Sequence, residues 1–281
     1  MMREIFSEEI VETVAELCRK ANCFLSADVK ESLQQADERE KSPAGKAVFR
    51  SILKNIALAE EKQRPLCQDT GMAVVFLEIG QEVHLCGQTW EEAVNAGVAK
   101  GYCEGYMRKS VVRHPLQRDN TGDNTPAIIH YQMVAGDKVK ITVAPKGFGS
   151  ENMSAVRMLK PAQGVEAVKD FVVETVKSAG PNPCPPTVVG VGIGGTMEKA
   201  AYLAKKALLR PLGKGSDDVF NAALEQELLR RINNLGIGPQ GFGGEVTSLF
   251  LAVETYPTHI AGLPVAVNIN CHVARHAEKI I

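Results

Sequence analysis

The chain has 281 residues, of which 44% are hydrophobic and 23% charged, and its formal net charge is −1. Such a chain can bury a core that needs no disulfide or structural metal. A near-neutral charge gives no electrostatic reason to expect nucleic acid or an anionic membrane as a partner. No apolar run reaches the roughly 18 residues of a membrane span, and the N-terminus lacks a signal peptide's apolar stretch. We therefore expect a cytoplasmic protein.

The first sixty residues are predicted to form a helical layer. Ser26 is a suitable N-cap for a second helix, and Ser42 and Pro43 are suitable openings for a third. Later segments also show helical spacing of apolar residues. The predicted helices span residues 3–20, a segment starting near 28, and 43–60, 90–101, 163–179, 197–209 and 216–235.

Short apolar runs between polar loops predict the strands. Residues 127–134 and 138–144 are expected to form a hairpin, because only Ala135, Gly136 and Asp137 separate them. Other strands are predicted at 72–79, 187–191, 246–254 and 263–269. Helices and strands alternate without a regular βαβ rhythm, which predicts a mixed α/β (α+β) fold in two lobes.

Seven cysteines raise the question of which carry chemistry. A free cysteine is most often a small buried hydrophobe. Cys18, Cys23, Cys86 and Cys103 lie in apolar-periodic surroundings and are expected to behave in this way.

Cys67, Cys184 and Cys271 differ, because each lies in a polar or proline-rich loop next to a predicted strand. Such junctions can aim a thiolate into a cleft. Spacings of 117 and 87 residues exclude the local ligand patterns of zinc fingers and ferredoxins. A 4Fe–4S cluster assembled by the fold is compatible with them, and three thiolates would leave one iron open as a Lewis acid.

Five motifs around these residues carry a resemblance to a known family. In chain order they are Leu-Cys-Gln-Asp-Thr-Gly at 66–71, Lys-Gly-Phe-Gly-Ser-Glu-Asn at 146–152, Cys-Pro-Pro-Thr-Val-Val-Gly-Val-Gly-Ile-Gly-Gly-Thr at 184–196, Gly-Pro-Gln-Gly-Phe-Gly-Gly at 238–244 and Asn-Ile-Asn-Cys-His at 268–272. Together they resemble the class I fumarate hydratase and L(+)-tartrate dehydratase family, over essentially the whole chain.

The resemblance implies that residues 1–281 form the α-subunit domain of an iron–sulfur hydro-lyase, with lobes around a cluster-binding cleft. It implies reversible hydration of fumarate to (S)-malate, with L(+)-tartrate dehydratase or mesaconase as the alternative. The family's cluster ligands map onto Cys67, Cys184 and Cys271. The chain stops at Ile281, so the family's C-terminal domain is expected on a separate β subunit, in an α2β2 heterotetramer.

The resemblance also implies residues that contact the dicarboxylate substrate. Gln68 and Asp69 match positions beside it, Arg108 matches an arginine that binds a carboxylate, and the amide of Gly149 is expected to face an anionic group. Asp69 and His259 are expected to form an acid–base pair.

Three of these residues also have a purely structural interpretation. Asp69 could form an Asx turn before Gly71, Arg108 could lie on a solvated helix face, and His259 could be a loop histidine. His272, beside Cys271, is a candidate hydrogen-bond donor to a cluster sulfur.

Two further interpretations compete with a hydro-lyase. The run Gly190 to Gly195 satisfies G-x-G-x-x-G, but Asp217 and Asp218 follow no strand, so the ribose contact of a dinucleotide site has no platform. The glycines are instead expected to pack tightly or to offer helix amides to an anionic substrate group. The non-enzymatic alternative is an iron–sulfur binding or redox-sensing protein.

Overall fold

The computed structural model describes residues 2–281 and divides the chain into two compact units. Unit 1 comprises the residues up to Leu25, Ile56–Phe148 and Arg275–Ile281, and unit 2 comprises Ser26–Asn55 and Gly149–Ala274. Each unit combines helices with a four-stranded mixed sheet. The predicted mixed α/β class is confirmed.

Most predicted helices form close to their expected bounds. Among residues 2–281, no helix is both long and apolar enough to cross a membrane. The α-helices are α1 (Ser7–Cys23), α2 (Ala27–Arg39), α3 (Pro43–Lys62), α4 (Trp90–Glu104), α5 (Phe148–Glu151), α6 (Gly164–Ala179), α7 (Met197–Ala207) and α8 (Val219–Asn233), with 3-10 turns at Pro161–Gln163 and Pro239–Gly241.

The strands include four short ones that the sequence did not reveal, at residues 3–6, 83–86, 155–159 and 277–280. The full set is β1 (Arg3–Phe6), β2 (Met72–Gly80), β3 (Val83–Cys86), β4 (Ile128–Val134), β5 (Val139–Lys146), β6 (Ala155–Leu159), β7 (Thr187–Gly194), β8 (Ser248–Tyr256), β9 (Leu263–Asn270) and β10 (Ala277–Ile280).

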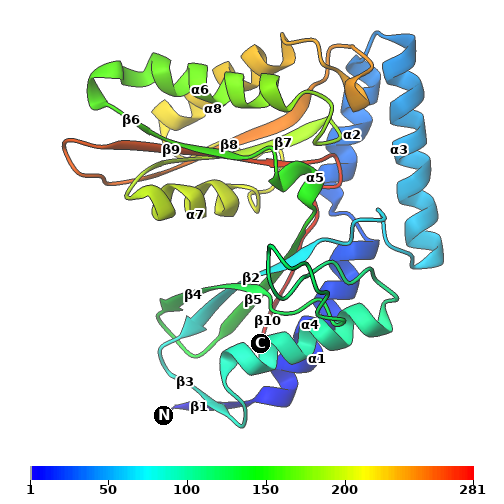
Figure 1. Ribbon diagram of the computed structural model, residues 1–281, viewed down its shortest axis with the longest axis vertical. Helices are drawn as coiled ribbons and strands as arrows, with labels where there is room; N and C mark the ends of the chain where they lie inside the picture. Colours follow the sequence, from blue (N-terminus) through cyan, green and yellow to red (C-terminus); the bar gives the residue numbers. More distant parts are fainter. Residues whose placement is uncertain (1) are drawn as a thin grey trace. The chain divides into compact units, whose positions relative to one another are not determined.

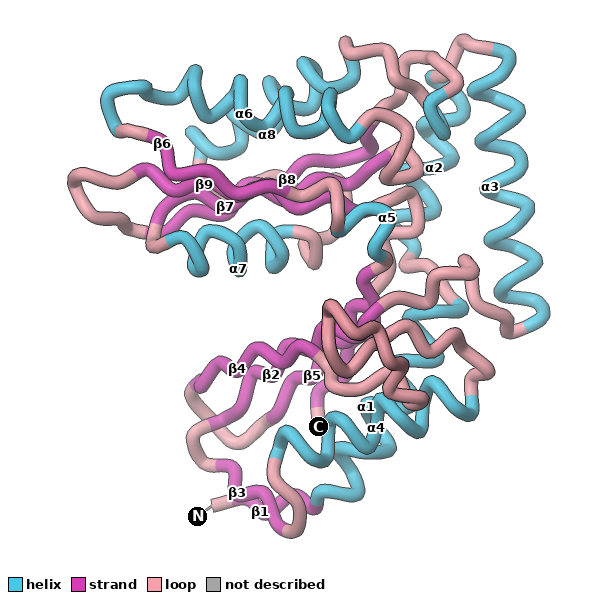
Figure 2. Tube along the Cα trace, in the orientation of Figure 1, coloured by secondary structure: helices cyan, strands magenta, loops and turns pink. Residues whose placement is uncertain are grey.

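Unit 1 is built on a sheet with the strand order β10-β5-β2-β4. Its central strand β2 pairs parallel with β4 and antiparallel with β5. Alternate β2 residues such as Val75 and Leu77 enter the core that contains Ile10 and Val14 of α1. Helices α1 and α4 lie together beside this sheet (Figure 2). They approach closely because a Cβ at Gly97 of α4 would stand 2.8 Å from the Val11 carbonyl oxygen.

Unit 2 is built on a sheet with the order β6-β9-β7-β8. Helices α6 and α8 cover one face and α7 the other (Figure 1). Val189 and Val191 of β7 belong to the core under α6 and α8. A Cβ at Gly190 or Gly192 would stand 2.0 or 2.1 Å from the carbonyl oxygens of Ala204 and Ala200 in α7. The glycine motif therefore allows a helix to pack on a sheet, which confirms the tight-packing interpretation.

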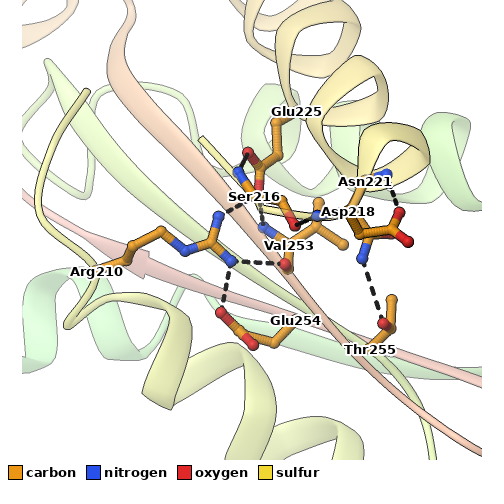
Figure 3. A network of polar contacts seen from close by, with 8 residues as sticks. All are labelled: Arg210, Ser216, Asp218, Asn221, Glu225, Val253, Glu254 and Thr255. Atoms are coloured by element: carbon orange, nitrogen blue, oxygen red, sulfur yellow. Dashed lines mark hydrogen bonds and ion pairs between the residues drawn. The ribbon is translucent and has the colours of Figure 1, made fainter. Parts of the chain in front are cut away.

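A partly buried ion-pair network fastens the segment between α7 and α8 to β8 (Figure 3). Arg210 pairs with Glu225 and Glu254 and donates to the Val253 carbonyl oxygen at 2.8 Å. Glu225 in turn accepts from the amides of Val253 and Ser216 at 2.8 and 2.9 Å. The charges are thus compensated where the chain crosses the end of the sheet.

Three sequence-based expectations are wrong. The first helix begins at Ser7 because residues 3–6 pair with β3 as β1. Strands β4 and β5 form no hairpin, because β2 lies between them and pairs with both. The first sixty residues form no single layer, since α1 belongs to unit 1 while α2 and most of α3 belong to unit 2.

Candidate functional site

The segment that carries Cys184 joins α6 to β7 in unit 2. Pro183, Pro185 and Pro186 leave it almost without amide donors, and the Cys184 amide donates to the Pro181 carbonyl oxygen at 3.0 Å. Cys184 has a left-handed backbone, with φ of 54°, and its side chain is exposed. The turn therefore presents the thiol at the beginning of β7.

Cys271 lies at the same edge of this sheet. It directly follows β9, which runs antiparallel to β7 and pairs Asn270 with Val188. The next residue, His272, contacts the Cys184 carbonyl oxygen through its backbone nitrogen at 3.3 Å and through Nδ1 at 3.0 Å. His272 thus links the two cysteine segments through backbone, where the sequence suggested a contact with cluster sulfur. Two predicted cluster ligands are brought together within unit 2.

The glycine-rich turn around Gly149 borders the same loops. A Cβ on Gly149 would lie 3.7 Å from the carbonyl oxygen of Asn182, two residues before Cys184. The turn is tied to β9, because Asn268 donates to Glu151 at 3.0 Å and the Ile269 amide donates to Ser154 Oγ at 3.1 Å. Gly149 is therefore placed beside the Cys184 segment.

His259 lies at the other end of the unit 2 sheet. It is in the exposed loop between β8 and β9, and the neighbouring Thr258 hydroxyl donates to the Gly195 carbonyl oxygen beyond the end of β7. The eight residues of β9 separate this loop from Cys271. At ~3.3 Å per residue, that separation is about 26 Å. The fold of unit 2 does not bring His259 to the two cysteines.

Cys67 lies in unit 1, in a loop that enters β2. The Leu66 amide donates to the Asn22 carbonyl oxygen at 2.9 Å, and Arg275 donates to the Asp69 carbonyl oxygen at 2.6 Å. These hydrogen bonds hold the backbone of the loop on both sides of Cys67. The thiol is half-buried and lies 3.3 Å from Gln68 Oε1.

The Asp69 carboxylate connects two of the predicted motifs. Oδ1 accepts from the Gly71 amide at 3.0 Å, so the Asx-turn interpretation is confirmed. Oδ2 accepts from the Phe148 amide at 2.9 Å. Each carboxylate oxygen can accept a second hydrogen bond, so these contacts leave Asp69 with acceptor capacity.

Arg108 lies beside this loop rather than on a helix. Helix α4 ends at Glu104, and the Thr70 hydroxyl donates to the Arg108 carbonyl oxygen at 3.0 Å. The side chain of Arg108 is exposed. Unit 1 therefore brings Arg108 close to Asp69, and the helix-face interpretation is wrong.

The remaining cysteines follow the sequence interpretation in part. Cys18 and Cys23 are buried, and burial raises the pKa of the Cys18 thiol to about 12. Cys86 is half-buried and Cys103 is exposed, so the expectation of burial is wrong for Cys103. Within residues 2–281, no three His, Cys, Asp or Glu side chains are grouped in metal-binding geometry.

Sequence reasoning missed two residues that hold the loop 238–246. Gln240 contacts the Pro185 carbonyl oxygen, and its position inside a glycine-rich motif was the available signal. Glu40, only 1% exposed, accepts hydrogen bonds from the amides of Glu245 and Val246 at 3.0 and 3.1 Å. Glu40 is 205 residues from Glu245 in sequence, so no local pattern indicates this contact.

Comparison with known proteins gives one consistent result. The family model described as fumarate hydratase (Fumerase) matches residues 11–280. A Methanocaldococcus jannaschii protein provisionally named L(+)-tartrate dehydratase subunit alpha is 46% identical, covering 96% of this chain and 97% of its own. The L(+)-tartrate dehydratase subunit alpha of Escherichia coli O157:H7 is 31% identical, covering 100% of this chain and 95% of its own.

The anchor formed by Glu40 predicts a pH-dependent stability. Burial raises the pKa of this carboxyl, but the amides of Ser42, Glu245, Val246 and Lys41 outweigh it and lower the pKa below its ordinary value. A lowered folded-state pKa stabilises the fold above the unfolded pKa, and this stabilisation is lost as pH falls through the folded pKa. Glu40→Gln should therefore lower the free energy of unfolding at pH 7 by about 2 kcal/mol, with a smaller loss below about pH 4.

Urea denaturation at pH 7 and at pH 3.5 measures this difference. Glu38→Gln, on the exposed face of α2 two residues before Glu40, is the matched control and should leave stability unchanged at both pH values. An equal loss for Glu40→Gln at both pH values would show that the carboxylate charge does not hold the loop.

Proposed function

The chain belongs to the fumarate hydratase (Fumerase) family, and we propose that it is the iron–sulfur α subunit of an enzyme that hydrates fumarate to (S)-malate reversibly. The reaction class follows from the family: the chain is a hydro-lyase. Cluster, substrate and partner are our proposal. The observation that carries it is the pair of contacts from His272 to the Cys184 carbonyl oxygen, which join two cysteine-bearing segments at one sheet edge.

We propose that Cys67, Cys184 and Cys271 hold a 4Fe–4S cluster. Their thiols fit this role because each is exposed or half-buried and lies on a loop fixed by contacts from distant residues. The raised pKa of the buried Cys18 thiol disfavours the thiolate that iron requires. Cys67 belongs to unit 1, and Cys184 and Cys271 belong to unit 2.

When bound, a cluster with three thiolate ligands supplies an open iron that polarises the hydroxyl group to be removed. The chain's own residues bind and orient the substrate. The Arg108 guanidinium is exposed beside the Asp69 loop and offers a planar, bidentate partner to one carboxylate. Gln68 offers a neutral amide, and the backbone amide of Gly149 is a further candidate donor to an anionic group.

We propose that Asp69 both shapes the loop and moves a proton. Its two hydrogen bonds to backbone amides fix the carboxylate, and its free lone pairs remain able to accept a proton from water or substrate. The pairing of Asp69 with His259 stays a prediction, since the two residues belong to different units. Within unit 2 the length of β9 separates His259 from the cysteines.

A second polypeptide is part of the proposal. Two relatives are named as alpha subunits, which supports a β partner in an α2β2 assembly. The chemistry points the same way, because a dicarboxylate presents two anionic groups and Arg108 can bind one of them. The β subunit would supply the other cation and the base at the carbon next to the hydroxyl.

L(+)-tartrate is the second candidate substrate, and the names of the two relatives specifically favour it. Tartrate carries one hydroxyl more than malate, and mesaconate one methyl group more than fumarate. A pocket that binds an extra hydroxyl discriminates strongly against a substrate that lacks it. The alternative of a non-catalytic iron–sulfur protein is disfavoured, because the family to which the chain belongs is a family of enzymes.

Replacing the proposed ligands tests the cluster directly. Cys67→Ser, Cys184→Ser and Cys271→Ser should each lose the brown chromophore and most of the iron after anaerobic reconstitution, because serine is a poor ligand for this cluster. Iron analysis and visible absorbance measure the loss. Cys103→Ser, which removes an exposed thiol from α4, should retain wild-type iron. Full cluster content in Cys184→Ser would overturn the ligand assignment.

Assays of the protein co-expressed anaerobically with its β partner test the substrate. Fumarate should give a kcat/KM roughly tenfold or more above L-tartrate and mesaconate, and the isolated chain should be almost inactive. Preference for L-tartrate would assign the chain to tartrate dehydration. Substantial fumarate hydration by the isolated chain would contradict the need for a partner.

A further inference from the structure

The proline-rich segment around Cys184 raises the question of what holds it in place. Three of its four residues from Pro183 to Pro186 lack an amide proton, so the segment can be held chiefly through its carbonyl oxygens. His272 contacts the carbonyl oxygen of Cys184. Gln240 donates to the Pro185 carbonyl oxygen, through its backbone amide at 2.8 Å and through its side-chain Nε2 at 2.7 Å.

Gln240 also reaches the segment that carries the other cysteine. Its Nε2 lies 3.3 Å from Nδ1 of His272, the residue that follows Cys271, and donates to Nδ1 in the tautomer in which the His272 backbone amide alone donates to the Cys184 carbonyl oxygen. One carboxamide therefore contacts the loops of both cysteines within unit 2.

The backbone at Gln240 is strained in a way that glycine would relieve. Its φ of 51° and ψ of 20° are left-handed, a conformation that costs a non-glycine residue roughly 1 kcal/mol. Its neighbours Gly238 and Gly241 have positive φ as glycines. A glutamine at such a position indicates that its side chain contributes something a glycine would not.

The loop around Gln240 is itself held firmly. A Cβ at Gly238 would stand 2.2 Å from the backbone of Gly243, and one at Gly241 would stand 2.4 Å from Pro181. Glu40 anchors the far end of the loop through the amides of Glu245 and Val246. A rigid loop is able to impose its position on the segment that it touches.

We infer that Gln240 is a positioning residue whose carboxamide, by donating to the Pro185 carbonyl oxygen, fixes the aim of the Cys184 thiol relative to Cys271. The ligand role of these thiols rests on the proposed function, whereas the fixing of the two segments does not. Gln240 and His272 also line a cavity of about 550 Å³ against α3. That space lets the segment shift when the carboxamide is lost.

Amide hydrogen exchange of the full chain without metal tests the inference. Gln240→Leu removes the side-chain donor, and Gln240→Glu keeps the size of the side chain but replaces that donor with a carboxylate. Both variants keep the backbone amide that also donates to Pro185. Both should raise the exchange rates of the Cys184 and His272 amides by about tenfold, while Val189 and Val191 amides in β7 stay protected. Gln63→Leu is the matched control, because Gln63 is exposed and also left-handed, with φ of 48°.

Two results would overturn the inference. Unchanged exchange at Cys184 and His272 in Gln240→Leu would show that the carboxamide does not hold these segments. Wild-type exchange in Gln240→Glu, with fast exchange in Gln240→Leu, would show that Gln240 acts by filling space. Exchange that rises equally at Val189 and Val191 would indicate general unfolding and would also count against a local positioning role.

Iron release separates this inference from the proposed function. After reconstitution, both Gln240 variants should lose iron to a chelator about tenfold faster than wild type and Gln63→Leu. A wild-type chain that binds no iron would refute the cluster proposal and leave the exchange test intact. Wild-type iron release in variants with loosened segments would refute the link between positioning and cluster retention.

Discussion

The antiparallel pairing of β7 with β9 is the constraint on which the candidate site depends. It sets the beginning of one strand beside the end of the other, with Val188 opposite Asn270. Cys184 precedes the first of these strands and Cys271 follows the second, so residues 87 positions apart in sequence reach one edge. The register is protected because a slip of one residue would turn Val189 and Val191 away from the core that they share with α6 and α8.

The backbone around Cys184, at this end of the sheet, offers more carbonyl acceptors than amide donors. Prolines around Cys184 remove amide protons but keep their carbonyl oxygens. Side chains from other loops contact two carbonyl oxygens of this segment, those of Cys184 and Pro185. Fewer amide protons near a thiolate also mean fewer hydrogen bonds to its sulfur, a property that tunes iron–sulfur clusters. In unit 1, Arg275 likewise holds the Cys67 loop through the carbonyl oxygen of Asp69. The prolines around Cys184 thus affect both the backbone hydrogen bonding and the cluster chemistry that we propose.

The sequence predicted those parts of the fold that are written in local patterns. The start signal of Ser42 and Pro43 located α3, helical spacing of apolar residues located α6, and the apolar run at 72–79 located β2. The supposed hairpin of β4 and β5 failed because β2, from far earlier in the chain, inserts between them. Such pairing is set by the burial of a whole sheet, which no short window records.

The same division applies to the site. The polar and proline-rich surroundings singled out Cys67, Cys184 and Cys271, since loop composition is local. The contacts of Glu40 with the loop 238–246 and of Gln240 with Pro185 join distant segments and could not be predicted. For His259, the strand predicted at 263–269 already lay between it and Cys271, so this separation could have been inferred from the sequence.

The central claim is that this chain holds a cluster that touches the substrate directly. Electron paramagnetic resonance of the reduced protein, prepared anaerobically with its β partner, tests it with and without saturating fumarate or malate. The account predicts an iron–sulfur signal whose g-values shift when the dicarboxylate is added, because the ligand alters the open iron. An identical spectrum in a preparation that turns over the same substrate would contradict it.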